Sequence, residues 1–394
     1  MDSVRLRGWW WARQGLDGSM SGRSAAEVLA RSGWMRSVGG AGPYLGLRAR
    51  AGLSRAAVDA AVAALEIHEL PSARGCTYVL PREHFALGLR VGQGFGDAAE
   101  IATAKKYLGV TDEELERLRG AVLDALAGRV LDPRGLKEAL GDQVRSLGPE
   151  GKKRGQTTTL PLALGWLQSH GYIRRVPTNG RLDQQRYAYA LWQPNPLDGG
   201  AGGAPELARA FFGWAGPATL AHFQAFSGLG VKDSKQAVAE LGLLPIASGD
   251  ARLVLPEDKA ALDDYSPPAE PRYAFLSNLD GLLLFRREIG PLLADATQPL
   301  WTEKGPQAGN ALVDLSNQAI VDRGRVVGLW DYDGLKGELV WTSFEPPDAA
   351  LREEAARTEA WIREELGDVR SFSLDSPESR GPRLAALRAM SARS

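Results

Sequence analysis

A cluster of basic and hydroxyl side chains near the middle of the chain has the composition of a phosphate-binding site. Lysine and arginine donate to phosphate oxygens, and threonine hydroxyls add further donors. The cluster consists of Lys152, Lys153, Arg154, Thr157 and Thr158. Residues 134–192 hold ten Lys/Arg and four Asp/Glu, so this segment carries +6 while the rest of the 394-residue chain carries −7. Positive charge is therefore concentrated here, with a merely solvated charged face as the alternative interpretation.

The residues after this cluster predict the element that must position it. The run 157–161, Thr-Thr-Thr-Leu-Pro, is typical of a helix N-terminus, because a hydroxyl can accept an orphan amide hydrogen and proline has none to satisfy. Three leucines then recur at helical spacing, at Leu160, Leu164 and Leu167. The predicted helix start also favours phosphate binding, because the N-terminus of a helix carries partial positive charge.

A β-hairpin is predicted directly after that helix. The pattern changes to period two over residues 172–176, a turn follows at 178–180, and a return strand covers 186–191. A helix followed by a basic hairpin is the layout of a winged helix, whose second helix can enter a DNA groove. Three hairpin residues therefore join the predicted phosphate contacts: Arg174, Arg175 and Arg181.

Composition places the chain among ordinary globular proteins and excludes several classes of site. Hydrophobic residues make up 44% and charged residues 24% of the chain. Its single cysteine excludes an internal disulfide framework and favours a reducing, cytoplasmic location. With four histidines we expect no metal site and no cofactor, because His68-Glu69 lacks the second histidine of a zinc motif. We also expect no signal peptide and no membrane-spanning segment.

The first third of the chain predicts several capped helices and one strand. Ser24 with Glu27 has the spacing of a capping box, and Ser54 and Thr111 are further cap candidates. The predicted helices cover residues 4–13, 24–31, 43–50, 54–65 and 111–126, with a strand at 76–80. Three consecutive tryptophans in the first helix could stack on a base, but helical geometry separates them by about 100°, which favours core packing.

The second half predicts a linker, more short helices and a set of strands. Three helices are expected between 206 and 244, and strands at 273–276, 281–285, 310–315, 318–321, 325–330 and 338–342. A helix at 348–366 and a mobile Ser/Arg-rich tail end the chain. The expected domains are residues 1–132 and 133–193 as winged helices, 194–205 as a flexible linker, 206–260 as a third winged-helix-like unit, and 261–394 as the strand-rich part.

Several short motifs in one order give the chain a family resemblance. They are Arg13-Gln14-Gly15-Leu16, Leu47-Arg48-Ala49-Arg50, Arg74-Gly75, Gly216-Pro217-Ala218-Thr219, Phe226-Ser227-Gly228-Leu229 and Val326-Val327-Gly328-Leu329-Trp330. The chain thereby resembles the bacterial winged-helix DNA glycosylases of the AlkZ and YcaQ type. The resemblance implies an α+β fold of tandem winged-helix (helix-turn-helix) domains followed by a small, mainly antiparallel β-barrel. It also implies action on alkylated or crosslinked double-stranded DNA.

The resemblance also implies where catalytic residues would lie. Family members carry a Gln-x-Gln or Gln-x-Asp triplet, where this chain has Val38-Gly39-Gly40-Ala41. Gly39 and Ala41 can neither hold nor polarise a water. Substitute chemistry could come from Asp17 as a base with Gln14 orienting the water, although a helix end with a local Asx turn is the favoured interpretation.

Two classes of function therefore remain open at the level of the sequence. One is a monomeric DNA-repair protein that binds damaged duplex and hydrolyses N-glycosidic bonds. The other is a non-catalytic DNA-binding regulator, or a self-resistance protein that shields lesions or sequesters a genotoxin.

Overall fold

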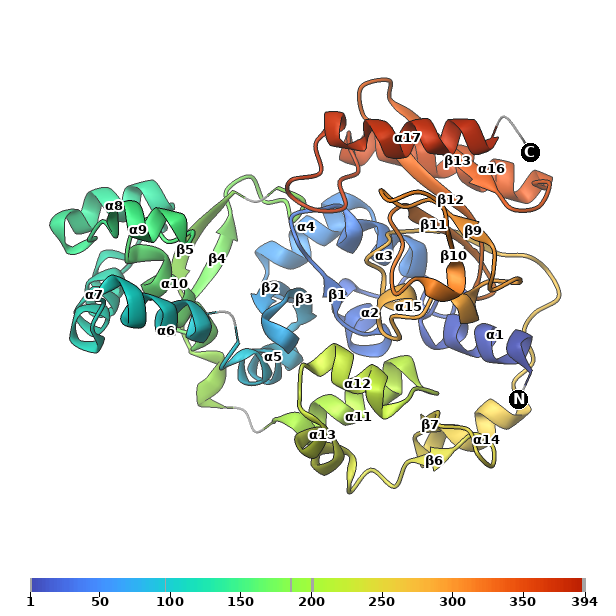
Figure 1. Ribbon diagram of the computed structural model, residues 1–394, viewed down its shortest axis with the longest axis horizontal. Helices are drawn as coiled ribbons and strands as arrows, with labels where there is room; N and C mark the ends of the chain where they lie inside the picture. Colours follow the sequence, from blue (N-terminus) through green and yellow to red (C-terminus); the bar gives the residue numbers. More distant parts are fainter. Residues whose placement is uncertain (1, 96, 185, 200–201, 392–394) are drawn as a thin grey trace.

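The computed structural model describes residues 2–95, 97–184, 186–199 and 202–391. Its architecture is mixed α+β, mostly helical, with small antiparallel sheets (Figure 1). A three-helix and hairpin unit occurs three times along the chain. In each unit the residue or short strand after the first helix pairs with the second strand of the hairpin. The helix and hairpin connectivity therefore recurs as a topology, although the three sequences share no obvious residue pattern, and the division into winged-helix domains stays a prediction.

The first unit lies at the centre of the molecule. Its sheet has the order β1-β3-β2, with Met35 paired to Val79 and Glu69 paired to the same residue from the other side. The strand β2 was absent from the sequence prediction. The elements are α2 Ala25–Ser32, β1 Met35–Arg36, α3 Gly42–Ala51, α4 Arg55–Ala63, β2 Ile67–Pro71 and β3 Thr77–Pro81.

The second unit forms the separate lobe on the left of Figure 1. Leu131 takes the place of the short first strand and pairs with Tyr189. The unit's elements are α7 Asp112–Ala125, α8 Pro133–Leu140, α10 Leu160–Ser169, β4 Ile173–Pro177 and β5 Tyr187–Leu191, flanked by α6 Asp97–Leu108 and α9 Gly148–Lys153. The predicted helix and hairpin of this module are confirmed within one or two residues.

The third unit lies below the first in Figure 1. Ala218 pairs with Leu253 in the position of the short first strand. Its elements are α11 Ala204–Ala215, α12 Leu220–Ser227, α13 Val231–Val238, β6 Leu244–Pro245 and β7 Leu253–Val254, and α14 Pro256–Asp264 follows. The three short helices predicted here are confirmed. Part of the predicted linker, at 200–201, lies outside the described residues.

Local capping explains where several helices begin. Ser24 and Glu27 form the predicted capping box, and the hydroxyls of Ser54 and Thr111 accept amide hydrogens at the starts of α4 and α7. The start of α10 is different, because Thr159 makes no cap hydrogen bond. Its hydroxyl instead accepts from the Arg145 amide at 3.2 Å, which ties the helix to the preceding loop.

The C-terminal strands do not close into a barrel within the part of the chain that is described. They form a four-stranded antiparallel sheet of order β13-β12-β11-β8 and a separate two-stranded sheet. The strands are β8 Tyr273–Leu276, β9 Pro299–Leu300, β10 Gln307–Ala308, β11 Gln318–Asp322, β12 Arg325–Asp333 and β13 Glu338–Ser343. The hairpin turn at Arg323-Gly324 has positive φ at both residues, which suits the twist of two antiparallel strands.

Two predicted strands in this region are wrong. Residues 281–284 form the short helix α15, which begins where the Asp280 carboxylate accepts the Leu282 amide hydrogen. The segment around Asn310 is a short 3₁₀ turn. Residues 281–284 are a short, largely buried apolar run, which has no periodicity that separates strand from helix, whereas the segment 310–314 is mostly exposed.

As far as Ser391, the C-terminal tail packs against the sheet, which corrects the expectation of a mobile tail for the described residues. Helix α16, Ala349–Trp361, continues as a π-helical turn to Leu366, and α17, Pro377–Ser391, lies along β12 and β13 (Figure 1). Arg380 is fully buried and bonds Asp368 at 2.8 Å, and Arg383 bonds Asp331 at 3.0 Å. Buried, paired arginines fix this segment, because an unpaired buried charge is costly.

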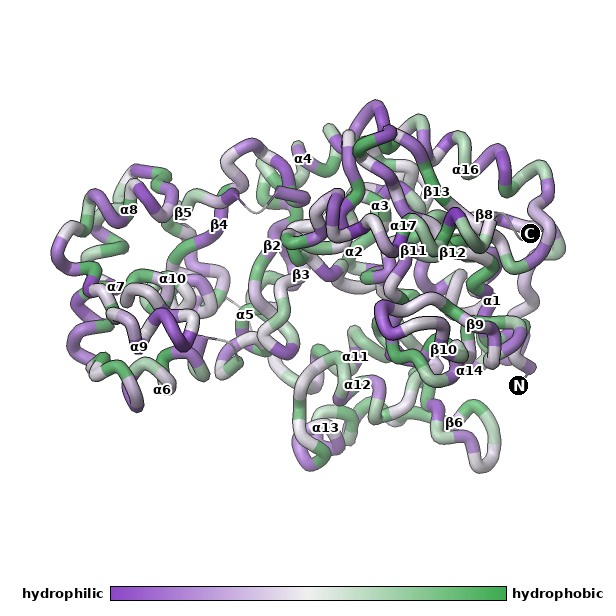
Figure 2. The backbone as a smooth tube through the Cα atoms, turned by 45° about the horizontal axis from the view of Figure 1, so that its top comes forward, coloured by the Kyte–Doolittle hydropathy of each residue, from purple (hydrophilic) through white to green (hydrophobic). Residues whose placement is uncertain are grey.

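The three tryptophans of α1, Ser3–Arg13, are packed rather than exposed. The indole nitrogens of Trp9 and Trp10 donate to the carbonyls of Gly216 and Pro217, so α1 fastens the third unit to the C-terminal part. No described helix is long and apolar enough to cross a membrane, and the tube in Figure 2 alternates between hydrophilic and hydrophobic stretches.

The tip of the second unit's hairpin is the joint between the lobe and the body. Leu182 is fully buried in the core of the first unit, and its amide donates to the Tyr44 hydroxyl at 2.9 Å. That hydroxyl in turn donates to Asp59 at 2.5 Å. Arg181 pairs with Asp183 and donates to the Leu366 carbonyl at 3.0 Å. The wing therefore docks into the protein itself.

Replacing Leu182 with Ala tests this joint. The lost burial and the remaining cavity should lower the free energy of unfolding by about 2–5 kcal/mol, measured by denaturant titration. Leu244→Ala is the matched control, because that leucine is 40% exposed and should change stability by about 0.5 kcal/mol or less. Equal effects of the two substitutions would show that the tip does not anchor the lobe.

Candidate nucleic-acid interface

The predicted basic cluster is exposed but partly neutralised by its own helix. Lys153 and Arg154 both pair with Glu150, at 3.5 and 2.9 Å, and the Arg154 guanidinium lies 4.1 Å from the centre of the Tyr107 ring. Lys152 and Thr157 are exposed and Thr158 is half-buried. Among these residues, Lys152 is the best placed to contact a phosphate, and that contact stays a prediction.

Helix α10 does not present a face to a DNA groove in this structure. Of its residues, Pro161 alone is exposed, because the helix is packed among α6, α7 and β4. A recognition helix needs polar side chains on an open surface to reach base edges. The expected use of this helix as a groove reader is therefore not supported by its burial.

The arginines of the hairpin strand β4 are half-buried close to the first unit. The Arg175 guanidinium lies 4.9 Å from the Tyr187 ring centre, and burial lowers the pKa of Arg174. Burial, with the charges of these two arginines, lowers the pKa of His68 to about 3. Arg181 in the hairpin tip donates to the Leu366 carbonyl, whereas Arg174 and Arg175 are half-buried near the seam, and phosphate contact by all three stays a prediction.

A buried polar cluster at the same seam was not found from sequence. The Ser37 hydroxyl donates to the Glu69 carboxylate at 2.5 Å, and both residues are buried. Burial and the nearby Glu69 carboxylate raise the pKa of Tyr187. His68 lies on the opposite face of the strand against Trp192, 5.0 Å between ring centres, so the predicted structural role of this histidine agrees with its packing.

Gln14 is the centre of a buried network and is not exposed to a substrate. Its amide donates to the carbonyls of Ser32 at 2.8 Å and Trp214 at 2.9 Å. Its oxygen accepts from Arg50 at 3.0 Å, and Arg50 pairs with Asp280 at 2.8 Å. Gln14 is 0% exposed. Since both ends of the amide are used, this geometry favours a structural role.

Asp17 makes the local contact that the alternative interpretation expected. Its carboxylate accepts from the Ser19 amide at 3.0 Å and from the Ser19 hydroxyl at 2.6 Å. The two candidate catalytic residues therefore do not converge on one bound water, since one is inside the protein and the other closes a turn. The catalytic assignment itself remains untested.

The loop at Gly39 and Ala41 lies under the C-terminal segment. The Ala41 amide donates to the Arg370 carbonyl at 2.8 Å, and the Ser373 amide donates to the Val38 carbonyl at 2.9 Å. A Cβ atom added to Gly40 would meet the Ser371 carbonyl oxygen at 2.4 Å. Residues 370–373 therefore cover the place where the resemblance implies base chemistry.

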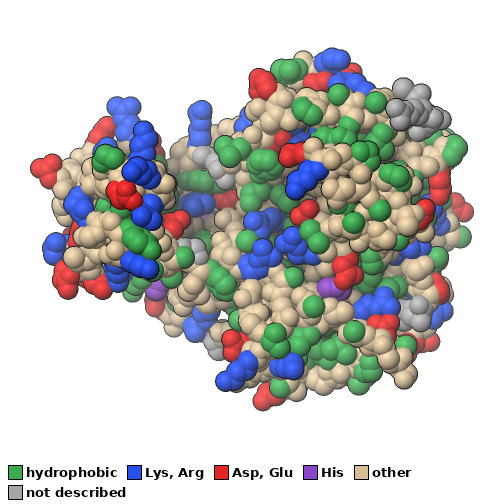
Figure 3. Space-filling view, viewed as in Figure 1, with side chains coloured by type: hydrophobic (Ala, Val, Ile, Leu, Met, Phe, Trp, Pro, Cys, Tyr) green, Lys and Arg blue, Asp and Glu red, His purple; other side chains and the backbone are tan. Residues whose placement is uncertain are grey.

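A small pocket beside this loop joins aromatic rings to three arginines. Its volume is about 180 Å³, and it lies between β1, β3, α12 and α15. Its aromatic wall consists of Trp34, Tyr78, Phe226 and Phe285, and its cationic rim consists of Arg36, Arg74 and Arg287. Lys and Arg side chains gather near the middle of this face of the molecule, over β1 (Figure 3).

Two of the rim arginines have an unusual backbone. Arg74 and Arg287 have φ of 59° and 52°, a left-handed conformation that is uncommon for residues other than glycine. Arg74 is held by a 2.7 Å hydrogen bond to the Ala225 carbonyl, and Arg287 lies 3.6 Å from Asp314. Such backbone geometry clusters at functional sites. Only Arg74-Gly75 had been singled out in the sequence, and no spacing linked it to Arg36 or Arg287.

Comparison with known proteins gives the family. Residues 30–372 match the model of the "DNA glycosylase AlkZ-like" family. The chain belongs to the AlkZ-like DNA glycosylase family. Its fold is similar to that of the Streptomyces sahachiroi DNA glycosylase AlkZ, with a TM-score of 0.68 and 21% identity over 94% of this chain and 98% of that one. No curated protein sequence matches the chain.

Replacing Asp280 with Ala tests the buried network around Gln14. Removing one partner of a buried ion pair leaves Arg50 uncompensated, so the free energy of unfolding should fall by about 3–5 kcal/mol. The double variant Arg50→Met/Asp280→Ala should recover part of that loss, because no charge is then left unpaired. Strictly additive losses in a double-mutant cycle would contradict the coupling.

Proposed function

We propose that this chain binds damaged or distorted double-stranded DNA through the face that holds the arginine-rimmed aromatic pocket. The observation that carries the proposal is the pocket itself, which joins three guanidinium groups to an aromatic wall in a member of a DNA glycosylase family. Guanidinium groups bind phosphates, and aromatic rings stack on bases that have left the helix.

The size of the pocket suits one ring system. Small-molecule sites usually measure about 300–1,000 Å³. At about 180 Å³ this pocket is smaller, so it would take a single extruded base with its phosphates on the rim. The exposed residues Lys152 and Thr157 on the lobe would add contacts to the flanking duplex.

Duplex binding should depend on the arginines of the rim. Arg36→Gln and Arg287→Gln should each weaken binding and reduce the slope of log K against log salt by about 0.9, the value for one lost phosphate contact. Fluorescence anisotropy with a labelled duplex carrying one alkylated purine, and with the intact duplex, measures both. Arg352→Gln on α16, outside the pocket, is the control. Unchanged slopes in both rim variants would exclude this face.

Base excision is the second candidate activity, and one carboxylate favours it. Asp314 is the acid among the residues that line the pocket, with its side chain 57% exposed beside Arg287. A carboxylate there could activate water or stabilise positive charge that develops on the sugar. It would stand in for the family triplet, which this chain replaces with glycine and alanine at Gly39 and Ala41.

An assay of released base separates the two activities. If Asp314 is the base, an alkylated duplex yields free base and abasic sites, and Asp314→Asn lowers the rate by about 10²–10⁴-fold. Asp17→Asn is the matched control and should retain the rate. No released base, with tight and salt-sensitive binding retained, would instead favour a protein that shields lesions or regulates repair without cleaving the glycosidic bond.

A further inference from the structure

A second and larger cavity lies away from the aromatic pocket. It measures about 490 Å³ and is enclosed by the turn after α1, the end of α3, the start of β8 and one face of α16. None of its lining residues belongs to the aromatic pocket. Its volume is in the range of small-molecule sites, about 300–1,000 Å³.

The side chains that line this cavity carry a net positive charge. Four arginines and one glutamate line it: Arg48, Arg50, Arg272, Arg357 and Glu354. Arg357 pairs with Glu354 at 2.7 Å, and Arg50 pairs with Asp280. Among the described residues, Arg48 and Arg272 have no carboxylate within ion-pair distance. Arg48 lies over the Trp361 ring, 4.5 Å from its centre, which leaves Arg272 as the lining guanidinium with neither a carboxylate nor an aromatic partner in the described part of the chain.

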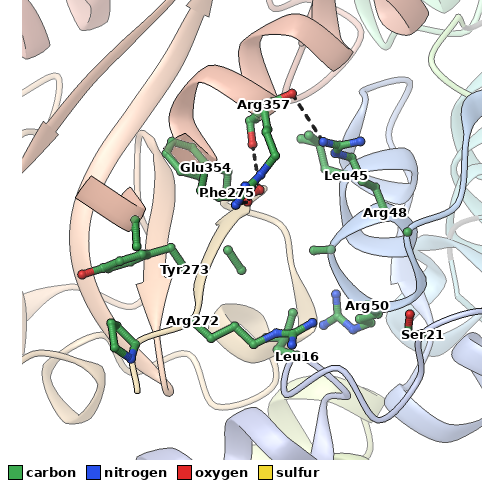
Figure 4. A pocket seen from close by; sticks show the side chains of 16 residues that line it. Leu16, Ser21, Leu45, Arg48, Arg50, Arg272, Tyr273, Phe275, Glu354 and Arg357 are labelled. Carbon is green, nitrogen blue, oxygen red and sulfur yellow. Dashed lines mark hydrogen bonds and ion pairs between the residues drawn. The ribbon is translucent and has the colours of Figure 1, made fainter. Parts of the chain in front are cut away.

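One end of the cavity brings two guanidinium groups together. Figure 4 shows the side chains of Arg272 and Arg50 extending toward each other, with Ser21 beside Arg50. Arg50 is 2% exposed, yet its Nε has no hydrogen-bond partner. Its Nη hydrogens are donated to Asp280, Gly46 and Gln14 and its Nε is closed to solvent, so an anion at this end would be bound by Arg272. A tetrahedral oxyanion suits it, because guanidinium forks match phosphate geometry.

The other end of the cavity has a different character. Glu354 lies there beside Arg357, with Arg48 close by, and Tyr273 and Phe275 are among the residues that line the cavity (Figure 4). A carboxylate repels a second anionic group but accepts hydrogen bonds from hydroxyl or amino groups. The cavity thus fits a molecule with a phosphate at the Arg272 end and hydroxyl or amino groups near Glu354.

We propose that this cavity binds a phosphate-bearing small molecule of nucleoside-monophosphate size, with its phosphate at Arg272. The phosphate of a DNA backbone offers the same oxyanion, so the two sources must be separated by experiment. The proposal does not depend on DNA binding or base excision at the aromatic pocket.

Calorimetric titration with AMP, inorganic phosphate and adenosine tests the site. AMP should bind more tightly than inorganic phosphate, and adenosine should bind much more weakly than AMP. Arg272→Gln should weaken AMP binding by about tenfold or more, since a hydrogen bond to a charged group is lost. Arg352→Gln, on the same helix α16 but outside the cavity, is the control. No binding of AMP, or equal affinity in both variants, overturns the proposal.

A competition experiment with duplex DNA identifies whether the bound phosphate belongs to a free small molecule or to a DNA backbone. If the ligand is a free small molecule, Arg272→Gln leaves duplex affinity unchanged and AMP does not compete with the duplex. If AMP displaces the duplex and Arg272→Gln weakens both, the cavity is a backbone contact and the small-molecule proposal is wrong. The Arg36 and Arg287 variants of the aromatic pocket should lose duplex binding but keep AMP binding. Failure of the DNA-binding proposal can therefore be told apart from failure of the AMP proposal.

Discussion

The buried ion pair of Arg50 and Asp280 is the constraint on which the body of this protein depends. Both side chains are removed from water, where unpaired charge is costly, and their remaining hydrogen-bonding groups are taken largely by the Gln14 oxygen, the Gly46 carbonyl and the Leu282 amide. Through Gln14 the network also reaches the ends of α2 and α11. It thereby positions the first unit, the third unit and the C-terminal part relative to one another.

This network also lies between the two cavities. Arg50 lines the larger cavity, while Gly281, the residue after Asp280, lines the aromatic pocket and approaches the Gln14 oxygen so closely that an added Cβ would lie 3.0 Å from it. The short helix α15 begins on the Asp280 carboxylate, so one wall of the aromatic pocket starts at the ion pair. A single set of buried hydrogen bonds therefore shapes both candidate sites.

Helices and strands were predicted well from the sequence where residues close in the chain determine them. Capping at Ser24, Ser54 and Thr111 and the apolar period of α10 depend on neighbours within a few residues, and these were recovered. The roles of Gln14, Arg175 and Arg181 depend on partners that are distant in sequence or belong to another unit. From the sequence, Arg181 was predicted to contact phosphate. Its hydrogen bond to the Leu366 carbonyl, which places it in the joint between lobe and body, is visible only in the structure.

The small residues at the expected catalytic loop and the segment that covers them are mutually dependent. Gly39 has φ of +76°, where glutamine would be strained, and Ala41 is 0% exposed, so a longer side chain has no room. Gly40 contacts the backbone of Ser371. Restoring two glutamines would therefore require residues 370–373 to move, and the ion pairs of Arg380 and Arg383 hold the flanks of that segment. The loop and its cover are therefore built around small side chains, which is why the proposed chemistry is sought in the arginine-rimmed pocket and not in the loop.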